Sequence, residues 1–241
     1  MTTPRKDIHN SDVPVLCQSC EARHKGICGA LDAEELVAFA EHTRVVRHAA
    51  GDVLMYEKGT IDSYGNVMRG VVKLTKTLKD GRQQIVGLQF APDFVGRLHA
   101  QESPVRVEAS SDIELCRISK AALQKLVAGK PALEARLLKQ ALREVDEARE
   151  WMLALGRKTA PEKVAGFLEM MASHSDPSAE ESSRPSFELS LTRAEIADFL
   201  GLTIGTVSRE FSRLKREGAI DITSHRHVTV RDRQSLRRRS G

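Results

Sequence analysis

Short apolar segments separated by glycines make up the middle of the chain, over residues 45–118. Runs such as 71–74 and 85–88 lie between recurring glycines, and an Asp80-Gly81 pair stands between two strand-like runs. An Asp-Gly pair in this setting is a strong signal for a β-hairpin. Many short strands joined by regular turns predict a sandwich, jelly roll or barrel.

A helical pattern follows from about Ser119. Between Pro131 and Pro161, apolar residues recur every seven positions and others fill the seam between them. Such a heptad-like stripe suits either packing within one domain or pairing with a second helix. We favour a dimer contact, because this long helix joins a β domain to a basic region. The predicted dimer residues are Leu138, Leu142, Val145, Ala148, Met152 and Leu155.

Three shorter segments have simpler interpretations. Residues 31–40 show a brief helical pattern, and a further helix begins at Pro161 and ends near Met171. Residues 173–186 are rich in Ser and Pro, which predicts a loop.

Residues 191–218 predict two short helices joined by a tight turn. Thr192 and Glu195 match a capping box at the start of the first helix. Gly201 suits the turn because it tolerates a positive φ, and Thr203 would cap the second helix. This combination is typical of a helix-turn-helix.

The second of these helices has an apolar and a polar face. Val207, Phe211 and Leu214 recur at steps of four and three, so they would be buried. On the other face, Arg209 can donate two hydrogen bonds to guanine, and Ser208 can reach a base edge or a phosphate. The predicted DNA-binding residues are Thr203, Gly205, Thr206, Ser208, Arg209, Ser212 and Arg213.

The distribution of charge agrees with a polyanionic partner. Residues 187–241 carry 11 basic and 7 acidic side chains, a net charge of +4, whereas the other 186 residues are neutral. Residues 220–230 alternate as a β-hairpin, with 225–227 at its tip. The sequence therefore predicts a winged helix-turn-helix, and a generic pair of helices is the weaker alternative.

Four cysteines form a separate candidate site. Cys17, Cys20 and Cys28 have C-x2-C-x7-C spacing, and Cys116 stands alone near the end of the β region. The chain has neither a signal-peptide pattern at its N-terminus nor an apolar run of roughly 20 residues, so we expect a cytoplasmic protein without a membrane partner. Disulfides are not the expected resting state there.

The spacing leaves open an iron–sulfur cluster, a zinc site, a thiol redox switch or unrelated buried cysteines. Structural zinc usually shows two close pairs of ligands, whereas a cluster accepts uneven spacing with one distant ligand, so we favour the cluster. A metal or haem sensor using His24, His42, His48 or His99 is a second hypothesis. No enzyme is expected, because no nucleophile–base pair or phosphate loop is recognisable.

The order and spacing of these features resemble the CRP/FNR transcription regulators, and within them the FNR-type oxygen sensors of α-proteobacteria. The resemblance spans nearly all of residues 15–235. It implies an α+β fold with a jelly-roll-like β-roll. The implied parts are a cysteine-rich segment (1–30), a β-roll sensor domain (31–120), a dimerisation helix region (121–158) and a winged helix-turn-helix domain (159–241).

The resemblance also implies a function. The four cysteines would hold a 4Fe–4S cluster, and the homodimer would bind palindromic promoter DNA when oxygen is low. Oxygen would degrade the cluster, weaken the dimer and release the DNA, and activation would involve contact with RNA polymerase. A zinc- or haem-dependent regulator of the same fold is the alternative.

Two departures from the family pattern matter. The cyclic-nucleotide branch has a Gly-Glu-x-x-Gly turn followed by an Arg-Ser/Thr pair. The corresponding regions here are 96–99 (GRLH) and 103–106 (SPVR), so we expect no cyclic nucleotide. FNR-type recognition helices commonly carry Glu where this chain has Gly205, so the usual FNR half-site is not assumed. Three explanations stay open: one base position of the operator is relaxed, a natural Glu has been replaced in this sequence, or a neighbouring side chain takes over the role.

Overall fold

The computed structural model describes residues 14–18, 20–175, 184–224 and 226–241. They form two compact units. One extends to Lys76 and also includes Gly87–Asp146, and the other consists of Thr77–Val86 and Glu147–Gly241. The α+β fold class expected from the sequence is confirmed. No helix in the described ranges has both the length and the apolar character needed to cross a membrane.

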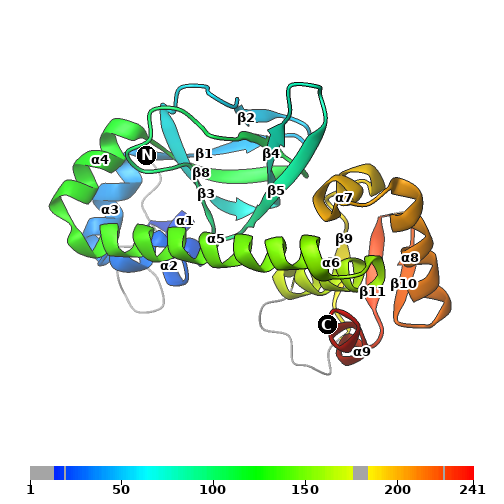
Figure 1. Ribbon diagram of the computed structural model, residues 1–241. Coiled ribbons are helices and arrows are strands. Elements are labelled where there is room, and N and C mark those ends of the chain that lie inside the picture. The colour runs from blue at the N-terminus through cyan, green and yellow to red at the C-terminus, as the bar shows by residue number, and fades with distance from the viewer. Residues whose placement is uncertain (1–13, 19, 176–183, 225) are drawn as a thin grey trace. The chain divides into compact units, whose positions relative to one another are not determined.

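The β-roll consists of two four-stranded sheets (Figure 1). The hairpin predicted at Asp80-Gly81 joins β4 to β5, with Gly81 at φ 88°. Val67, Val72 and Val107 are buried in the core. One sheet has the order β1 (Thr43–His48), β8 (Ile113–Ser119), β3 (Ser63–Arg69), β6 (Phe94–Val95), and the other β2 (Val53–Met55), β7 (Arg106–Ala109), β4 (Val71–Thr77), β5 (Gln83–Phe90).

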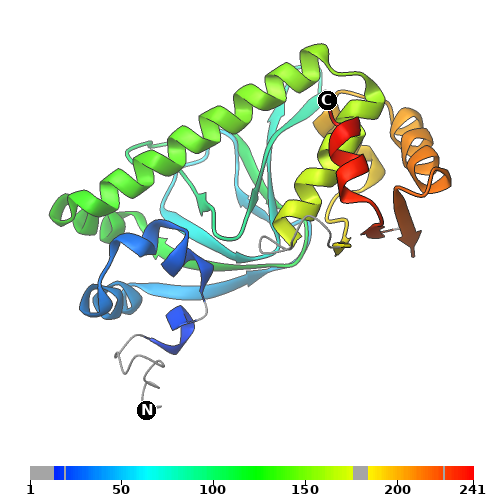
Figure 2. The ribbon, with the colours of Figure 1, turned by 90° about the horizontal axis from the view of Figure 1, so that it is seen from below.

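Short helices and the first half of the long helix form a second core in the same unit. Asp32 caps α3 and forms a capping box with Glu35, and Ser119 caps α4. Figure 2 shows the N-terminal helices at the same end of the β-roll as the start of α5. The helices are α1 (Val15–Gln18), α2 (Glu21–His24), the 3-10 helix η1 (Ile27–Ala30), α3 (Ala33–Glu41), α4 (Lys120–Gly129) and α5 (Pro131–Arg157).

The second unit contains the helix-turn-helix and a small sheet of order β10-β11-β9. Phe167, Phe199 and Phe211 are buried in its core. Its elements are α6 (Ala160–Ser175), β9 (Ser186–Glu188), α7 (Arg193–Leu200), α8 (Ile204–Arg216), β10 (Ile220–Thr223), β11 (His227–Val230) and α9 (Arg233–Arg239).

The structure corrects the sequence expectations at both ends of the predicted loop 173–186. Helix α6 continues to Ser175, and Ser186 already belongs to β9, which pairs with β11. Residues 176–183 of this loop lie outside the described residues, as does residue 225 at the predicted wing tip. His227 lies in β11 rather than at the tip. An edge strand of three residues carries too little periodicity to be recognised from sequence.

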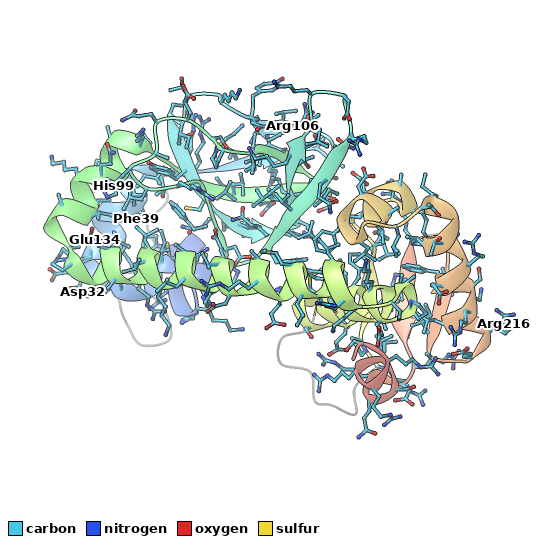
Figure 3. All side chains as sticks on the ribbon, in the orientation of Figure 1. Asp32, Phe39, His99, Arg106, Glu134 and Arg216 are labelled. Carbon is cyan, nitrogen blue, oxygen red and sulfur yellow. The ribbon has the colours of Figure 1, made fainter. Side chains whose placement is uncertain are left out.

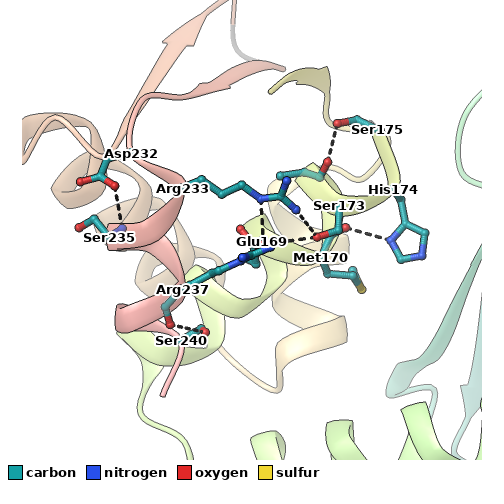
Figure 4. A network of polar contacts seen from close by, with 11 residues as sticks. Glu169, Met170, Ser173, His174, Ser175, Asp232, Arg233, Ser235, Arg237 and Ser240 are labelled. Carbon is teal, nitrogen blue, oxygen red and sulfur yellow. Dashed lines mark hydrogen bonds and ion pairs between the residues drawn. The ribbon is translucent and has the colours of Figure 1, made fainter. Parts of the chain in front are cut away.

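Helix α9, which was not predicted, is held on α6 by a polar network (Figure 4). The carboxylate of Glu169 accepts hydrogen bonds from Arg233 Nε at 3.0 Å and from Arg237 Nε at 2.8 Å. Arg233 also donates to Ser173 Oγ at 2.8 Å and is only 6% exposed. This buried ion pair attaches α9 to α6 within the second unit.

Candidate cysteine site and nucleic-acid interface

Four cysteines from different parts of the fold line one small cavity. Cys17 and Cys20 come from the α1–α2 region, Cys28 from η1 and Cys116 from β8. Strand pairing places Cys116 opposite Asn66 of β3. The remaining lining residues are Arg23, Phe39 (labelled in Figure 3), Thr43, Asn66 and Met68. The structure thus brings together all four predicted ligands, although they are up to 99 residues apart.

The cysteines share this cavity without forming a compact cage. Within the described ranges, no group of three or more His, Cys, Asp or Glu side chains is arranged to hold a single metal ion. The predicted histidines therefore do not assemble with one another or with the cysteines into such a group among these residues.

Burial controls the chemistry of the thiols. Desolvation, helped by the neighbouring Cys116 and Cys20, raises the pKa of Cys17 to about 11, while Arg23 opposes this shift. Burial also raises the pKa of Cys28 and, with a smaller opposing effect from a hydrogen bond with Thr43, that of Cys116. Without a metal ion in the cavity, the thiols of Cys17, Cys28 and Cys116 are neutral at pH 7. Three buried thiols that are neutral in the absence of a metal ion suit a metal centre, because a metal ion binds and stabilises the thiolate form.

Asn66 is the polar residue that the sequence reasoning missed. It is only 1% exposed, and its side-chain Nδ2 donates a hydrogen bond to Cys28 Sγ at 3.8 Å. The available signal was an amide within the otherwise apolar inward pattern of β3. On its own, that signal did not show which residue the amide would contact.

The cysteine segment packs directly on the long helix. Ile27 and Cys28 share a hydrophobic core with Leu133 and Leu137 of α5. Gly29 permits this close approach, because a Cβ there would lie 3.1 Å from Arg136 Nη2 and 3.0 Å from the Arg23 carbonyl oxygen.

Beyond these contacts, α5 presents an exposed apolar stripe. Leu138 is 60% exposed, and Leu142, Val145 and Met152 are exposed as well. Ala148 is also exposed. Leu155 differs from the other predicted dimer residues, since it is half-buried and lies beside Gly201 of the helix-turn-helix.

The helix-turn-helix has the local geometry expected from its sequence. Thr192 Oγ1 accepts from the Glu195 backbone, and the Glu195 carboxylate accepts from the Thr192 backbone at 2.8 Å. Gly201 adopts the left-handed conformation at φ 61°. Thr203 Oγ1 accepts from the Thr206 N–H, so its hydroxyl serves as the helix cap.

The two faces of α8 are also as expected. Val207, Phe211 and Leu214 are buried, and most of the predicted DNA-binding positions on the opposite face are exposed, with Thr206 half-buried. Arg209 Nη2 donates to Thr206 Oγ1 at 3.1 Å. Among the described residues, and apart from the backbone of its own helix, a Cβ on Gly205 would have Arg209 Nη1 at 3.6 Å and Thr203 Oγ1 at 3.9 Å as its neighbours within 4 Å.

The C-terminal end of α8 holds further positive charge. Arg213 Nε donates to Glu217 at 2.9 Å, and this contact raises the pKa of the Arg213 guanidinium. Arg239 of α9 pairs with the same carboxylate. Arg216 lies at the exposed end of the helix (Figure 3).

Comparison with known proteins shows which proteins share this arrangement. Family models for a Crp-like helix-turn-helix domain and for a cyclic nucleotide-binding domain match residues 162–239 and 45–130. A probable transcriptional activator from Rhizobium leguminosarum bv. viciae is 47% identical over 238 residues, which cover 99% of this chain and 98% of that protein. The chain belongs to the CRP/FNR family of transcription regulators.

Other members are similar over most of this CRP/FNR regulator. The transcriptional activator protein FnrL of Cereibacter sphaeroides is 39% identical over 235 residues, which cover 95% of each chain. The structure of FixK2 from Bradyrhizobium japonicum superposes with a TM-score of 0.74 at 28% identity, covering 83% of this chain and 98% of that one. Family membership confirms the expectation of a DNA-binding regulator rather than an enzyme.

Proposed function

We propose that this CRP/FNR regulator is an oxygen-responsive transcription activator of the cytoplasm, with a 4Fe–4S cluster held by Cys17, Cys20, Cys28 and Cys116. The observation that carries the proposal is the convergence of the four cysteines on one cavity next to the long helix. Relatives named as transcriptional activators, FnrL among them, support activation and therefore a contact with RNA polymerase.

The residues of the cavity fit such a group. Four cysteines are the ligand number that 4Fe–4S clusters use, and one ligand is commonly distant in sequence. Arg23 adds a positive charge at the cavity wall, which offsets part of the charge of four thiolates. When bound, the cluster would supply the oxygen-labile chemistry of the sensor.

Packing connects the cavity to the dimer face. When Cys28 is held toward Cys116, η1 is held against the β-roll, and Ile27 then supports Leu133 and Leu137 of α5. The exposed stripe starts at the next residue, Leu138. We infer that this support orients α5 for pairing with the same helix of a second copy, and that its loss weakens the homodimer.

Pairing of two copies would bring two recognition helices to one palindromic site. Half-sites about 34 Å apart, one turn of DNA, are the usual spacing for dimeric helix-turn-helix proteins. Ser208, Arg209 and Ser212 are exposed on the face that would meet base edges. Gly205 offers no side chain for a base contact, so one position of each half-site would be read weakly.

Cyclic nucleotide is not part of this proposal. The match to the cyclic nucleotide-binding domain concerns residues of the β-roll. Arg106, the arginine that lies nearest in sequence to the expected phosphate-binding pair, donates to Glu108 at 2.9 Å and lies over the Tyr56 ring. Its guanidinium is therefore already engaged.

The test combines metal content with DNA binding. The full chain, purified without oxygen, should contain about four irons and four sulfides, with a visible absorbance that is lost in air. It should bind a palindromic promoter only before exposure to air. Cys116→Ser should lose both properties, whereas Met68→Leu, which changes the same cavity wall without removing a thiol, should keep them.

Other outcomes would refute the proposal. Zinc without visible absorbance would indicate a structural metal site, and a Soret band would indicate haem. Equal promoter binding by the wild type and Cys116→Ser, with and without oxygen, would refute the switch itself.

A further inference from the structure

Asn66 connects the two sides of the cysteine cavity. Its backbone lies opposite Cys116 in the β3–β8 pairing, and its side chain donates to Cys28 Sγ in η1. β6 pairs with β3 on the other side, where Phe94 lies opposite Asn66. The amide is therefore held in place by strands on both sides while it contacts the N-terminal cysteine segment.

The Asn66 side chain is also buried, where a polar amide group destabilises the fold unless it is fully hydrogen-bonded. Asn66 is 1% exposed, and its Oδ1 has no hydrogen-bond partner among the described residues. A buried polar group with an unmet acceptor destabilises a fold and calls for a functional explanation. Of the two polar atoms of the amide, Nδ2 has a hydrogen-bond partner, and that partner is Cys28 Sγ.

We propose that Asn66 is a positioning residue that donates to the Cys28 thiolate and thereby sets how readily the bound cluster is lost to oxygen. This inference rests on the proposed function. A hydrogen bond to a thiolate is charge-assisted and stronger than one to a neutral thiol. Hydrogen bonds to the sulfurs are among the factors that set cluster potentials.

The direction of the effect follows from the charge on sulfur. A donor to Cys28 Sγ stabilises the more electron-rich, reduced form of the centre. Removal of the donor lowers the midpoint potential, so oxidation and iron loss become faster. It also removes the hydrogen bond that joins β3 to η1, which weakens the hold on the segment that carries Cys28.

The test compares a substitution by a smaller side chain with one by a side chain of similar size. Asn66→Ala leaves space and Asn66→Leu fills it, yet both remove the donor. Gln89→Met is the matched control. Gln89 is another buried amide with an unpaired oxygen, and it donates to the Phe94 carbonyl at 3.1 Å without lining the cysteine cavity. Circular dichroism establishes that each variant is folded before its cluster is reconstituted without oxygen.

The readouts are the midpoint potential, the rate of visible bleaching in air and the rate of iron transfer to a chelator. Both Asn66 variants should lose iron about 10–100-fold faster, because removing a hydrogen-bond partner of a metal ligand typically lowers metal affinity by about this factor. Their potentials should be lower than that of the wild type, while Gln89→Met should match the wild type.

The possible failures are distinguishable. If the wild type takes up iron and sulfide but both Asn66 variants match its potential and rates, the role of Asn66 is wrong and the proposed function stands. If only one variant differs, packing rather than hydrogen bonding explains the effect, and the inference is also wrong. If the wild type takes up no cluster, both the proposed function and this inference are refuted.

Discussion

Replacing Glu169 by Gln removes the negative charge that α6 presents to two arginines of α9. Arg233 is 6% exposed and would keep only its hydrogen bond to Ser173 and a neutral acceptor on the new amide. Removing one partner from a buried ion pair usually costs about 3–5 kcal/mol. Arg237 is partly solvated, with 41% of its side chain exposed. We therefore expect a loss of about 2–3 kcal/mol in the free energy of unfolding.

Thermal and urea unfolding of the full chain measure this loss. For a unit of roughly 100 residues, it corresponds to a decrease in Tm of about 10–20 °C. Glu162→Gln is the control, because Glu162 lies in the first turn of the same helix. Its exposed carboxylate accepts a hydrogen bond from the Thr159 backbone N–H. A glutamine can still accept that hydrogen bond, so the control should lose less than about 1 kcal/mol.

A double variant tests the physical reason for the effect. Replacing Glu169 and Arg233 together by Leu removes both buried charges, and such replacements are often neutral or stabilising. We expect the double variant to be more stable than Glu169→Gln. If Glu169→Gln unfolds within about 0.5 kcal/mol of the Glu162→Gln control, the ion pair does not hold α9 in place and the reasoning is refuted.

Four further outcomes are expected. In the metal-free protein at pH 8, iodoacetamide should modify Cys17 slowly, because a pKa of about 11 leaves roughly one thiolate in a thousand; mass spectrometry should show the rate rising with pH toward 11, and a fast reaction at pH 8 would contradict the burial. In sedimentation experiments, Leu142→Glu should give a monomer under the cluster-loaded conditions in which the wild type is a dimer, whereas the Tm of the cluster-free protein should not fall, since Leu142 is 56% exposed; a persistent dimer would exclude this face of α5. Arg209→Ala should weaken promoter binding by about 1–3 kcal/mol and relax one base position, whereas Arg216→Ala should weaken all sequences alike and reduce the salt slope by about one; competition titrations distinguish the two. Gly205→Ala should stabilise the recognition helix by up to about 1 kcal/mol, because a Cβ there has ordinary van der Waals contacts; a decrease in Tm would refute this reasoning.

Local sequence signals predicted most of the DNA-binding unit. The caps at Thr192 and Thr203, the left-handed glycine at position 201 and the buried stripe of α8 all depend on residues within four positions of one another. Short-range hydrogen bonding and helical periodicity determine such features, so the sequence alone was enough. Strand β9 and helix α9 were missed because each is short and is stabilised by partners elsewhere, β11 for one and Glu169 for the other.

For the cysteine site, the sequence determined the ligand types, their spacing and the β-rich region that follows them. Only the tertiary structure decided that Cys116 joins the other three, because strand pairing between β8 and β3 sets its position, and that pairing spans about fifty residues of chain. The same pairing placed Asn66 beside Cys28, and the packing of Ile27 connected the site to α5. Contacts between residues far apart in the chain depend on the register and packing of whole elements, and no local pattern encodes them.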